Sequence, residues 1–116
     1  MKILNKEYEI DFYDADIMEK IETGIEKVDA VVKQNKTVEN QKTSIIIRKV
    51  CNTIFNFFDD VFGEGASKDI FGSKTSLTLC IKAYEDFINE KIKQDEAIEN
   101  ISKKYSPNRA TRRAKK

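Results

Sequence analysis

The stretch IIRKVCNTIFNFFDDVFG, residues 46–63, is the most hydrophobic segment of the chain. Its apolar residues recur every three or four positions, which is the spacing of one face of an α-helix. Gly63 follows directly, in the position where a left-handed residue ends many helices. We therefore predict a helix that ends at Gly63 and forms the centre of the core. Its apolar face consists of Ile46, Ile47, Val50, Ile54, Phe57, Phe58, Val61 and Phe62.

An amphipathic helix is also predicted upstream, at residues 14–35. Asp14 stands at its start, where a carboxylate can accept hydrogen bonds from the first backbone N–H groups. Gly24 lies inside this helix, where glycine costs about 1 kcal/mol relative to alanine. It indicates either a close packing contact or simple tolerance. The polar segment 34–44 lacks an apolar stripe, so we expect either a turn of the chain or a solvated end of a helix there. The apolar face consists of Ile17, Ile21, Ile25, Val28 and Val32.

The first 13 residues show a different period, because their apolar side chains alternate. The break at Asn5-Lys6 has residues that tolerate the positive φ of a tight turn. We predict a β-hairpin over residues 1–13. A lone hairpin is marginally stable in water, so its apolar face must pack on the helices or pair with another chain, and the pattern leaves both open. The face consists of Ile3, Tyr8, Ile10 and Phe12.

The segment at residues 63–75 has two glycines two residues apart, which end the central helix. Ser67 is predicted to cap a single helical turn that Gly72 ends. Ile70 and Phe71 are apolar residues within this loop, and we expect them to fix it to the core.

A long third helix is predicted from Ser73 or Thr75 to about residue 105. It should stop there because Pro107 disfavours helical dihedral angles at the residue before it. Its expected apolar face consists of Leu77, Ile81, Tyr84, Ile88 and Ile92, continued by Ile98, Ile101 and Tyr105.

The overall class that follows is mainly α. A chain of 116 residues is long enough for one domain with a core. Four glycines and one proline are too few for a sandwich or barrel with many tight turns. We predict a single helical domain at residues 1–105, with the hairpin at 1–13 and about three amphipathic helices, followed by a short, basic, flexible or disordered tail at residues 106–116.

Residues that carry chemistry are scarce. The chain has no histidine, the commonest general base and metal ligand. Neighbouring acids at 59–60 and 85–86 point about 100° apart on a helix, which is typical of solvated faces. The GEG at 63–65 lacks the GK[ST] of a phosphate loop. Cys51 and Cys80 lie in apolar segments without CxxC spacing, so we interpret both as buried small hydrophobes. We predict no enzyme, metal site or cofactor.

No apolar run approaches the roughly 18 residues of a membrane span, and glutamates interrupt the start where a signal peptide would be apolar. The sequence therefore predicts a soluble, cytosolic protein without a membrane contact.

The basic end of the chain contrasts with the rest. From Lys103 onward there are seven basic residues and no acid, whereas residues 1–102 have 14 basic and 20 acidic residues, a net charge of −6. The tail can be a solubilising terminus without a partner. It can also be an arm that neutralises nucleic-acid phosphates, or a segment that becomes helical only against an acidic protein surface, including this chain's own. Composition does not choose among the three.

Three stretches together resemble small tail assembly chaperones of long-tailed phages and of prophages in Gram-positive bacteria. They are KILNKEYEIDF at 2–12, FFDDVFGEGASKDIFG at 57–72 and YSPNRATRRAKK at 105–116. The best single feature is the pattern Asn108-Arg109-Ala110-x-Arg112-Arg113.

The resemblance implies a helical protein without catalytic activity. Such proteins keep the long tape measure protein soluble and recruit tail tube subunits around it. They act in the host cytoplasm during virion assembly and do not remain in the finished particle, and some are made in two lengths by ribosomal frameshifting. The apolar faces of the second and third helices exceed what a chain of this length buries, so we also expect a homo-oligomer.

Two groups of residues are candidate partner contacts. The apolar group around the glycine loop has a simpler interpretation as core, and the arginines can also belong to a tail without a partner. The alternative function is a small nucleic-acid-binding regulator that uses the basic arm. The acidic body would repel phosphates, so we expect no specific nucleic-acid binding. The candidates are Phe57, Phe58, Phe62, Ile70, Phe71, Arg109, Arg112 and Arg113.

Overall fold

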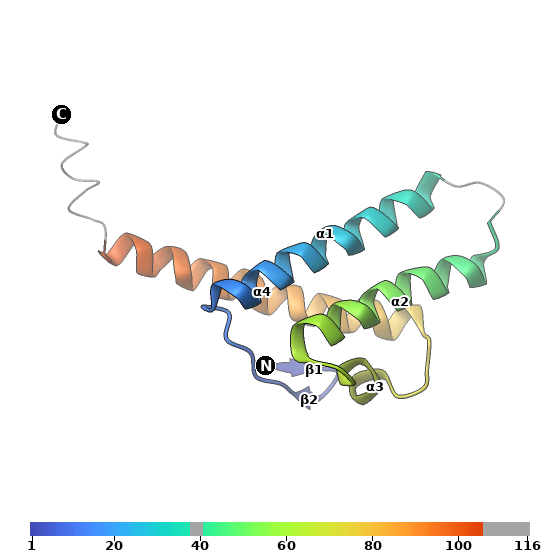
Figure 1. Cartoon of the computed structure of the whole chain (residues 1–116), viewed down its shortest axis with the longest axis horizontal. Coiled ribbons are helices and arrows are strands. Elements are labelled where there is room, and N and C mark those ends of the chain that lie inside the picture. The colour runs from blue at the N-terminus through green and yellow to red at the C-terminus, as the bar shows by residue number, and fades with distance from the viewer. Residues whose placement is uncertain (38–40, 106–116) are drawn as a thin grey trace.

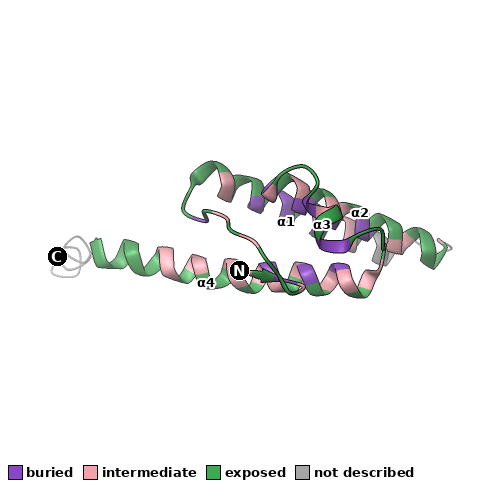
Figure 2. Cartoon of the chain, turned by 90° about the horizontal axis from the view of Figure 1, so that it is seen from below, coloured by how far each residue is buried: buried purple, intermediate pink, exposed green. Residues whose placement is uncertain are grey.

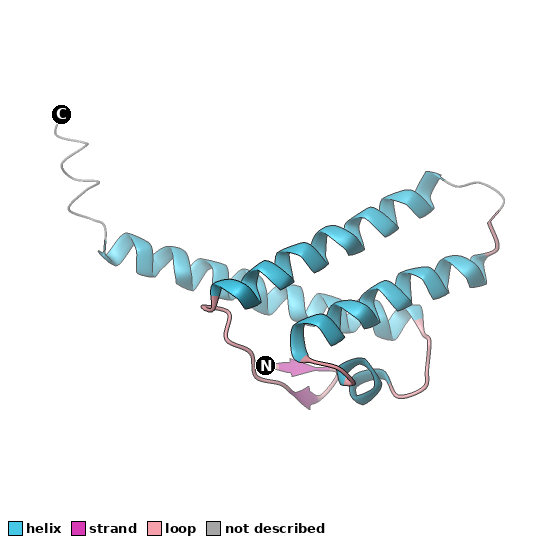
Figure 3. Cartoon of the chain, viewed as in Figure 1, coloured by secondary structure: helices cyan, strands magenta, loops and turns pink. Residues whose placement is uncertain are grey.

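The computed structural model describes residues 1–37 and 41–105, a part of the chain that contains two short strands and four helices (Figures 1 and 3). The predicted mainly helical class with an N-terminal hairpin is confirmed, while the predicted basic tail lies outside the described residues. In chain order the elements are β1 (Lys2–Ile3), β2 (Lys6–Glu7), α1 (Ala15–Thr37), α2 (Thr43–Phe62), α3 (Ala66–Phe71) and α4 (Leu77–Tyr105).

The hairpin is shorter than predicted, and its turn lies one residue earlier. β1 and β2 are antiparallel, and the turn residues are Leu4 and Asn5, with φ of 48° and 70°. Positive φ at both positions suits the two-residue turn whose twist matches that of the strands. The predicted turn at Asn5-Lys6 is therefore wrong by one residue, because Lys6 already pairs with Ile3 in the two-stranded sheet. The paired residues are Lys2 with Glu7 and Ile3 with Lys6.

The hairpin packs on helices of its own chain, which answers the question that its sequence left open. Ile3 is fully buried, β1 contacts α4, and the Leu4 N–H donates to the Asp86 carboxylate on α4 at 3.4 Å. Residues 8–14 leave the hairpin and lead to α1. Phe12 on this segment is buried, with its ring centroid 5.7 Å from that of Phe87.

α1 begins as predicted and packs against α2. The Asp14 Oδ1 accepts hydrogen bonds from the backbone N–H groups of Asp16 at 2.9 Å and Ile17 at 3.2 Å. A Cβ atom added to Gly24 would lie 2.3 Å from Cδ1 of Phe57. The glycine therefore reflects a close packing contact between the two helices and not simple tolerance.

α2 is the central element, in contact with α1, α3 and α4. Figure 2 shows α1, α2 and α3 in one layer and α4 in a second layer, with buried residues on the facing sides. Gly63 ends α2 and donates its N–H to the Asp59 carbonyl at 2.9 Å, but its φ of 110° and ψ of 160° differ from the predicted left-handed cap. The buried residues of α2 are Val50, Cys51, Ile54, Phe57, Phe58 and Val61.

α3 starts in a different way from the one predicted. Gly65, with φ of 91°, precedes its first residue, and Ser67 lies inside the helix without capping it. The N–H and the hydroxyl of Ser67 both donate to the Asp59 carboxylate, at 2.8 and 3.1 Å. Asp59, expected on a solvated face, thus fixes α3 to the end of α2. Gly72 ends α3 as predicted, with φ of 65°.

α4 packs the first part of its predicted face, Leu77 to Ile88, against the core, but its most buried residues lie beside that face. Cys80, Ala83 and Phe87 are fully buried, whereas the predicted face is half-buried as far as Ile88, and Ile92 is exposed. Phe87, absent from the predicted face, lies at the centre of the aromatic core. Its ring centroid is between 5.1 and 6.1 Å from those of Phe12, Phe57, Phe58 and Phe62.

Candidate protein-binding surface

The apolar candidates around the glycine loop come together, but in the interior. Phe58 and Phe71 have ring centroids 5.8 Å apart, and the partly buried Phe62 lies 5.1 Å from the Tyr8 ring. A partner cannot reach the buried candidates unless the core opens, so the described conformation gives them a structural role. The four buried candidates are Phe57, Phe58, Ile70 and Phe71.

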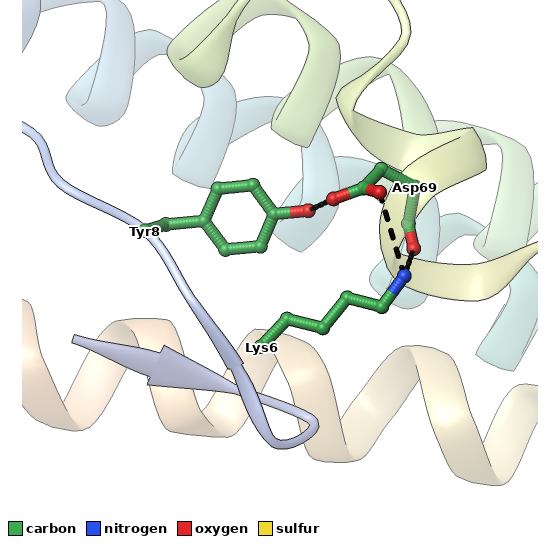
Figure 4. Close-up of polar contacts among 3 residues, drawn as sticks. All are labelled: Lys6, Tyr8 and Asp69. Atoms are coloured by element: carbon green, nitrogen blue, oxygen red, sulfur yellow. Dashed lines mark hydrogen bonds and ion pairs between the residues drawn. The ribbon is translucent and has the colours of Figure 1, made fainter.

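A polar contact joins the hairpin segment to α3 (Figure 4). The Tyr8 hydroxyl donates to the Asp69 carboxylate, and the Lys6 ammonium donates to the Asp69 backbone carbonyl and lies 3.4 Å from Oδ1. Burial, together with the Asp69 hydrogen bond and charge, raises the pKa of Tyr8 to about 12. The Tyr8 hydrogen bond and the Lys6 charge lower the pKa of Asp69. At neutral pH the phenol is protonated, so the contact holds two segments together and supplies no base.

The two cysteines meet inside the core. Cys51 on α2 and Cys80 on α4 are both fully buried and not in a disulfide. Burial raises the pKa of the Cys80 thiol, and a hydrogen bond with Cys51 raises it further. A protonated, buried thiol such as that of Cys80 is a poor nucleophile. Both cysteines are packed among apolar side chains as small hydrophobes, as predicted. Within residues 1–37 and 41–105, no group of three or more His, Cys, Asp or Glu could hold a metal ion.

One side of α4 carries residues spaced alternately four and three apart, the repeat by which helices pair along a common seam. We call this row the α4 stripe. Cys80, Tyr84 and Phe87 form its inner part, against the core. Lys91 and Gln94 form its middle, and the Lys91 ammonium lies 2.6 Å from the Asp95 carboxylate. Its outer part consists of Ile98, Ile101 and Tyr105.

The outer part of the α4 stripe is half-buried at Ile98 and exposed beyond it. Ile101 is 43% exposed and Tyr105 is 76% exposed. Figures 1 and 2 show that this end of α4 extends beyond the other elements. Beside it, the residues before and at the start of α1 form the opposite wall of an apolar groove, where Tyr13 is 55% exposed. The apolar groove is lined by Phe12, Tyr13, Ala15, Met18, Ile98, Ile101 and Ser102.

A second, acidic groove lies next to the middle of the stripe. Three of its lining residues are acidic and none is Lys or Arg, and the ammonium of the lining residue Met1 is already paired with Glu7 at 2.9 Å, so the groove can attract a cation. α4 ends with the opposite charge, at Lys103 and Lys104. The acidic groove is lined by Met1, Tyr8, Glu9, Ile10, Asp11, Phe12, Glu90 and Gln94.

The predicted contact arginines Arg109, Arg112 and Arg113 lie outside the described residues. The sequence placed Ile98, Ile101 and Tyr105 on one helix face, but it did not single them out as a surface. The sequence feature that could have identified this surface is the repeat along the α4 stripe. The repeat continues for two helical turns beyond the residues that the core can cover.

The fold and this surface define a class: a small, mainly helical protein with an N-terminal hairpin and an apolar surface at one end of its last helix. The chain belongs to the family described as "Family of unknown function (DUF6673)", whose model matches residues 4–116. No curated protein and no solved structure matches the chain. None of the helices in the described ranges is both long and apolar enough to cross a membrane.

Proposed function

We propose that this protein is a tail assembly chaperone of a phage or prophage, a non-enzymatic protein that binds the tape measure protein and keeps it soluble. The observation that carries the proposal is the exposed apolar end of α4 beside the start of α1. Large exposed apolar patches mark sites of protein interaction. Tyr13, Ile101 and Tyr105 are among the most exposed large hydrophobic side chains of the described residues.

The apolar groove suits an amphipathic helix as its ligand. A helix that lies in a groove inserts apolar side chains three and four residues apart, and the walls of this groove are themselves helical at Met18 and Ile98. A tape measure protein is long and helical, with apolar stripes that are exposed before assembly. A shallow groove can hold such a stripe and release it, which a chaperone requires.

In this proposal the basic tail is an electrostatic contact. Arg109, Arg112 and Arg113 follow α4 closely in sequence, so they can reach an acidic surface on a partner that already occupies the groove. Such contacts increase the rate of association and weaken with salt. The tail tube protein is the second proposed partner, recruited while the tape measure protein is held. The chaperone acts in the bacterial cytoplasm as a homo-oligomer and is absent from the finished virion.

Co-expression tests the proposal. The chain is produced together with the long tape-measure-like protein encoded in the same phage or prophage, and the soluble fraction of the long protein is measured. We expect its solubility to rise, and the two proteins to purify together. The variant Ile101→Glu should lose this effect. Ile45→Glu is the matched control, because Ile45 has nearly the same exposure, 42%, at the start of α2.

The result that overturns the proposal is a long protein equally insoluble with and without the chain. A duplex titration at two salt concentrations then tests the alternative, a nucleic-acid-binding regulator. Sequence-specific binding that survives the higher salt and is lost when Arg109, Arg112 and Arg113 become alanine would support that regulator. Weak binding at low salt alone is the ordinary behaviour of a cationic segment.

A further inference from the structure

We propose that the outer part of the α4 stripe is the interface of an antiparallel homodimer. When the apolar residues of two helices follow this repeat, the helices associate through those residues, which pack side chain against side chain. The inner part of the stripe is already covered by the core, and the same repeat then continues through Ile98, Ile101 and Tyr105 with nothing opposite Tyr105 in the described residues. A second copy supplies the same apolar row and covers it, so in the proposed chaperone the second copy and the tape measure protein compete for this surface.

The charges favour a second copy as the occupant. The middle of the stripe borders the acidic groove with Glu9, Asp11 and Glu90, and the end of α4 carries Lys103 and Lys104. Opposite charges therefore lie at opposite ends of the exposed surface. Lys103 is partly satisfied by Glu99 at 3.6 Å, and Lys104 lies 5.7 Å from its own Tyr105 ring.

One chain cannot bring these ends together. Fourteen residues of helix separate Glu90 from Lys104, a rise of about 21 Å. Two copies with antiparallel α4 helices place the basic end of each against the acidic groove of the other. A parallel pair would put Lys104 beside Lys104, which is unfavourable.

The spacing defines the register of the pair. When Ile98 of one copy lies over Ile101 of the other, Tyr105 falls over Gln94, and the same contacts recur by two-fold symmetry. Glu90 and Lys104 are two repeats apart and lie on the same side of the stripe. In an antiparallel pair, these sides face each other. In this register Lys104 of each copy is level with Asp95 of the other, and Glu90 lies five residues further along the seam, a rise of about 7.5 Å that a lysine side chain can span.

The first test is sedimentation of the full chain over a range of concentrations. We expect a monomer–dimer equilibrium whose dissociation constant rises about 100-fold in Ile101→Glu, since the dimer loses two apolar contacts and gains two buried charges. Ile45→Glu is the control of equal exposure and should leave the equilibrium unchanged. Circular dichroism shows that both variants keep the fold.

The second test determines orientation. Lys104→Glu and Glu90→Lys, made separately, should each weaken the dimer about 3- to 10-fold, as exposed ion pairs do. Combined in one chain they restore opposite charges across the antiparallel seam, so the double variant should recover most of the loss. Loss without recovery would overturn the antiparallel arrangement.

Two outcomes would overturn the dimer itself. One is a chain that stays monomeric at every accessible concentration, or that responds equally to Ile101→Glu and Ile45→Glu. The other is a monomer that dimerises only when Arg109, Arg112 and Arg113 are replaced by alanine, because the chain's own tail would then be the occupant. These measurements use the pure protein, so their outcome is separate from that of the proposed chaperone function.

Discussion

The inner and outer parts of the α4 stripe belong to one helix and one repeat, yet their environments are opposite. Phe87 in the inner part is fully buried and touches rings from α2 and from the segment before α1. Tyr105 in the outer part is 76% exposed. Helical periodicity is the same at both positions, and only the elements opposite them differ.

The difference shows what decides burial on a long helix. The repeat determines which side chains share a face, and the lengths of the neighbouring elements determine how much of that face is covered. β1 and α2 cover the inner part of the stripe, and Phe12 extends the cover to Phe87. Past Gln94, the apolar groove shows that the start of α1 lines the stripe without closing over it.

The strongest test of the inner part is Phe87→Ala. Removal of a fully buried phenylalanine leaves a cavity and should lower the free energy of unfolding by about 3–5 kcal/mol. Chemical denaturation monitored by circular dichroism measures the loss. Ile92→Ala on the same helix is the control, since Ile92 is 50% exposed, and it should change stability by less than about 0.5 kcal/mol. Equal losses in the two variants would contradict the assigned core face.

Gly24→Ala tests how tightly α1 and α2 pack near the same aromatic cluster. Alanine should gain about 1 kcal/mol of helix propensity, but its Cβ would lie 2.3 Å from the Phe57 ring. Overpacking costs about 1–3 kcal/mol, so we expect a net loss of about 1 kcal/mol. In a Phe57→Leu background the same change should become stabilising, because the clash is relieved. A stabilised Gly24→Ala in the parent chain would show that the contact relaxes freely.

The sequence predicted the helices well because their boundaries and periods depend on local features, such as the Asp14 cap and the apolar face that ends at Phe62. The sequence-based prediction failed where contacts between residues far apart in the sequence determine the structure. Asp59 caps a helix that starts beyond two glycines, which no local pattern indicates. The predicted face of α4 packs against the core as far as Ile88 but missed its centre at Phe87, because Ile81 and Ile88 lie beside that centre and give an equally good helical period. The Tyr8–Asp69 contact joins residues 61 positions apart.

Asp59→Ala should loosen α3, since it removes both hydrogen bonds to Ser67. Loss of a comparable helix cap costs about 1 kcal/mol, and the effect should appear as a lower unfolding midpoint. The neighbouring Asp60 is exposed, so Asp60→Ala is a control with the same change of charge. Similar effects in both variants would mean that charge, and not the contact with Ser67, stabilises this end of α2.

Alkaline pH should weaken the contact between the hairpin segment and α3. The pKa of Tyr8 is raised from 10.0 to about 12. Its protonated form therefore stabilises the fold fully below pH 10, and this contribution is lost as the pH rises from 10 towards 12. Burial raises the pKa of Tyr84 to about 12 as well, so the parent chain loses stability from both groups. Tyr8→Phe should show a smaller loss over this range, and an unchanged pH profile would contradict the contact.

The outer part of the stripe should contribute almost nothing to the stability of one copy alone. Below the dimer dissociation constant, Ile101→Glu should change the free energy of unfolding by less than about 0.5 kcal/mol, as expected for an exposed position. At concentrations above the dimer dissociation constant, the unfolding midpoint of the parent chain should rise with protein concentration, because only folded chains form the dimer. Ile101→Glu should have a midpoint independent of concentration.

Phe87→Ala should lower the midpoint at every concentration, because Phe87 stabilises the single copy. If the unfolding midpoint of Ile101→Glu still rises with protein concentration, the dimer interface lies elsewhere. The inner and outer parts of the α4 stripe would then differ in burial but not in a role in dimerisation.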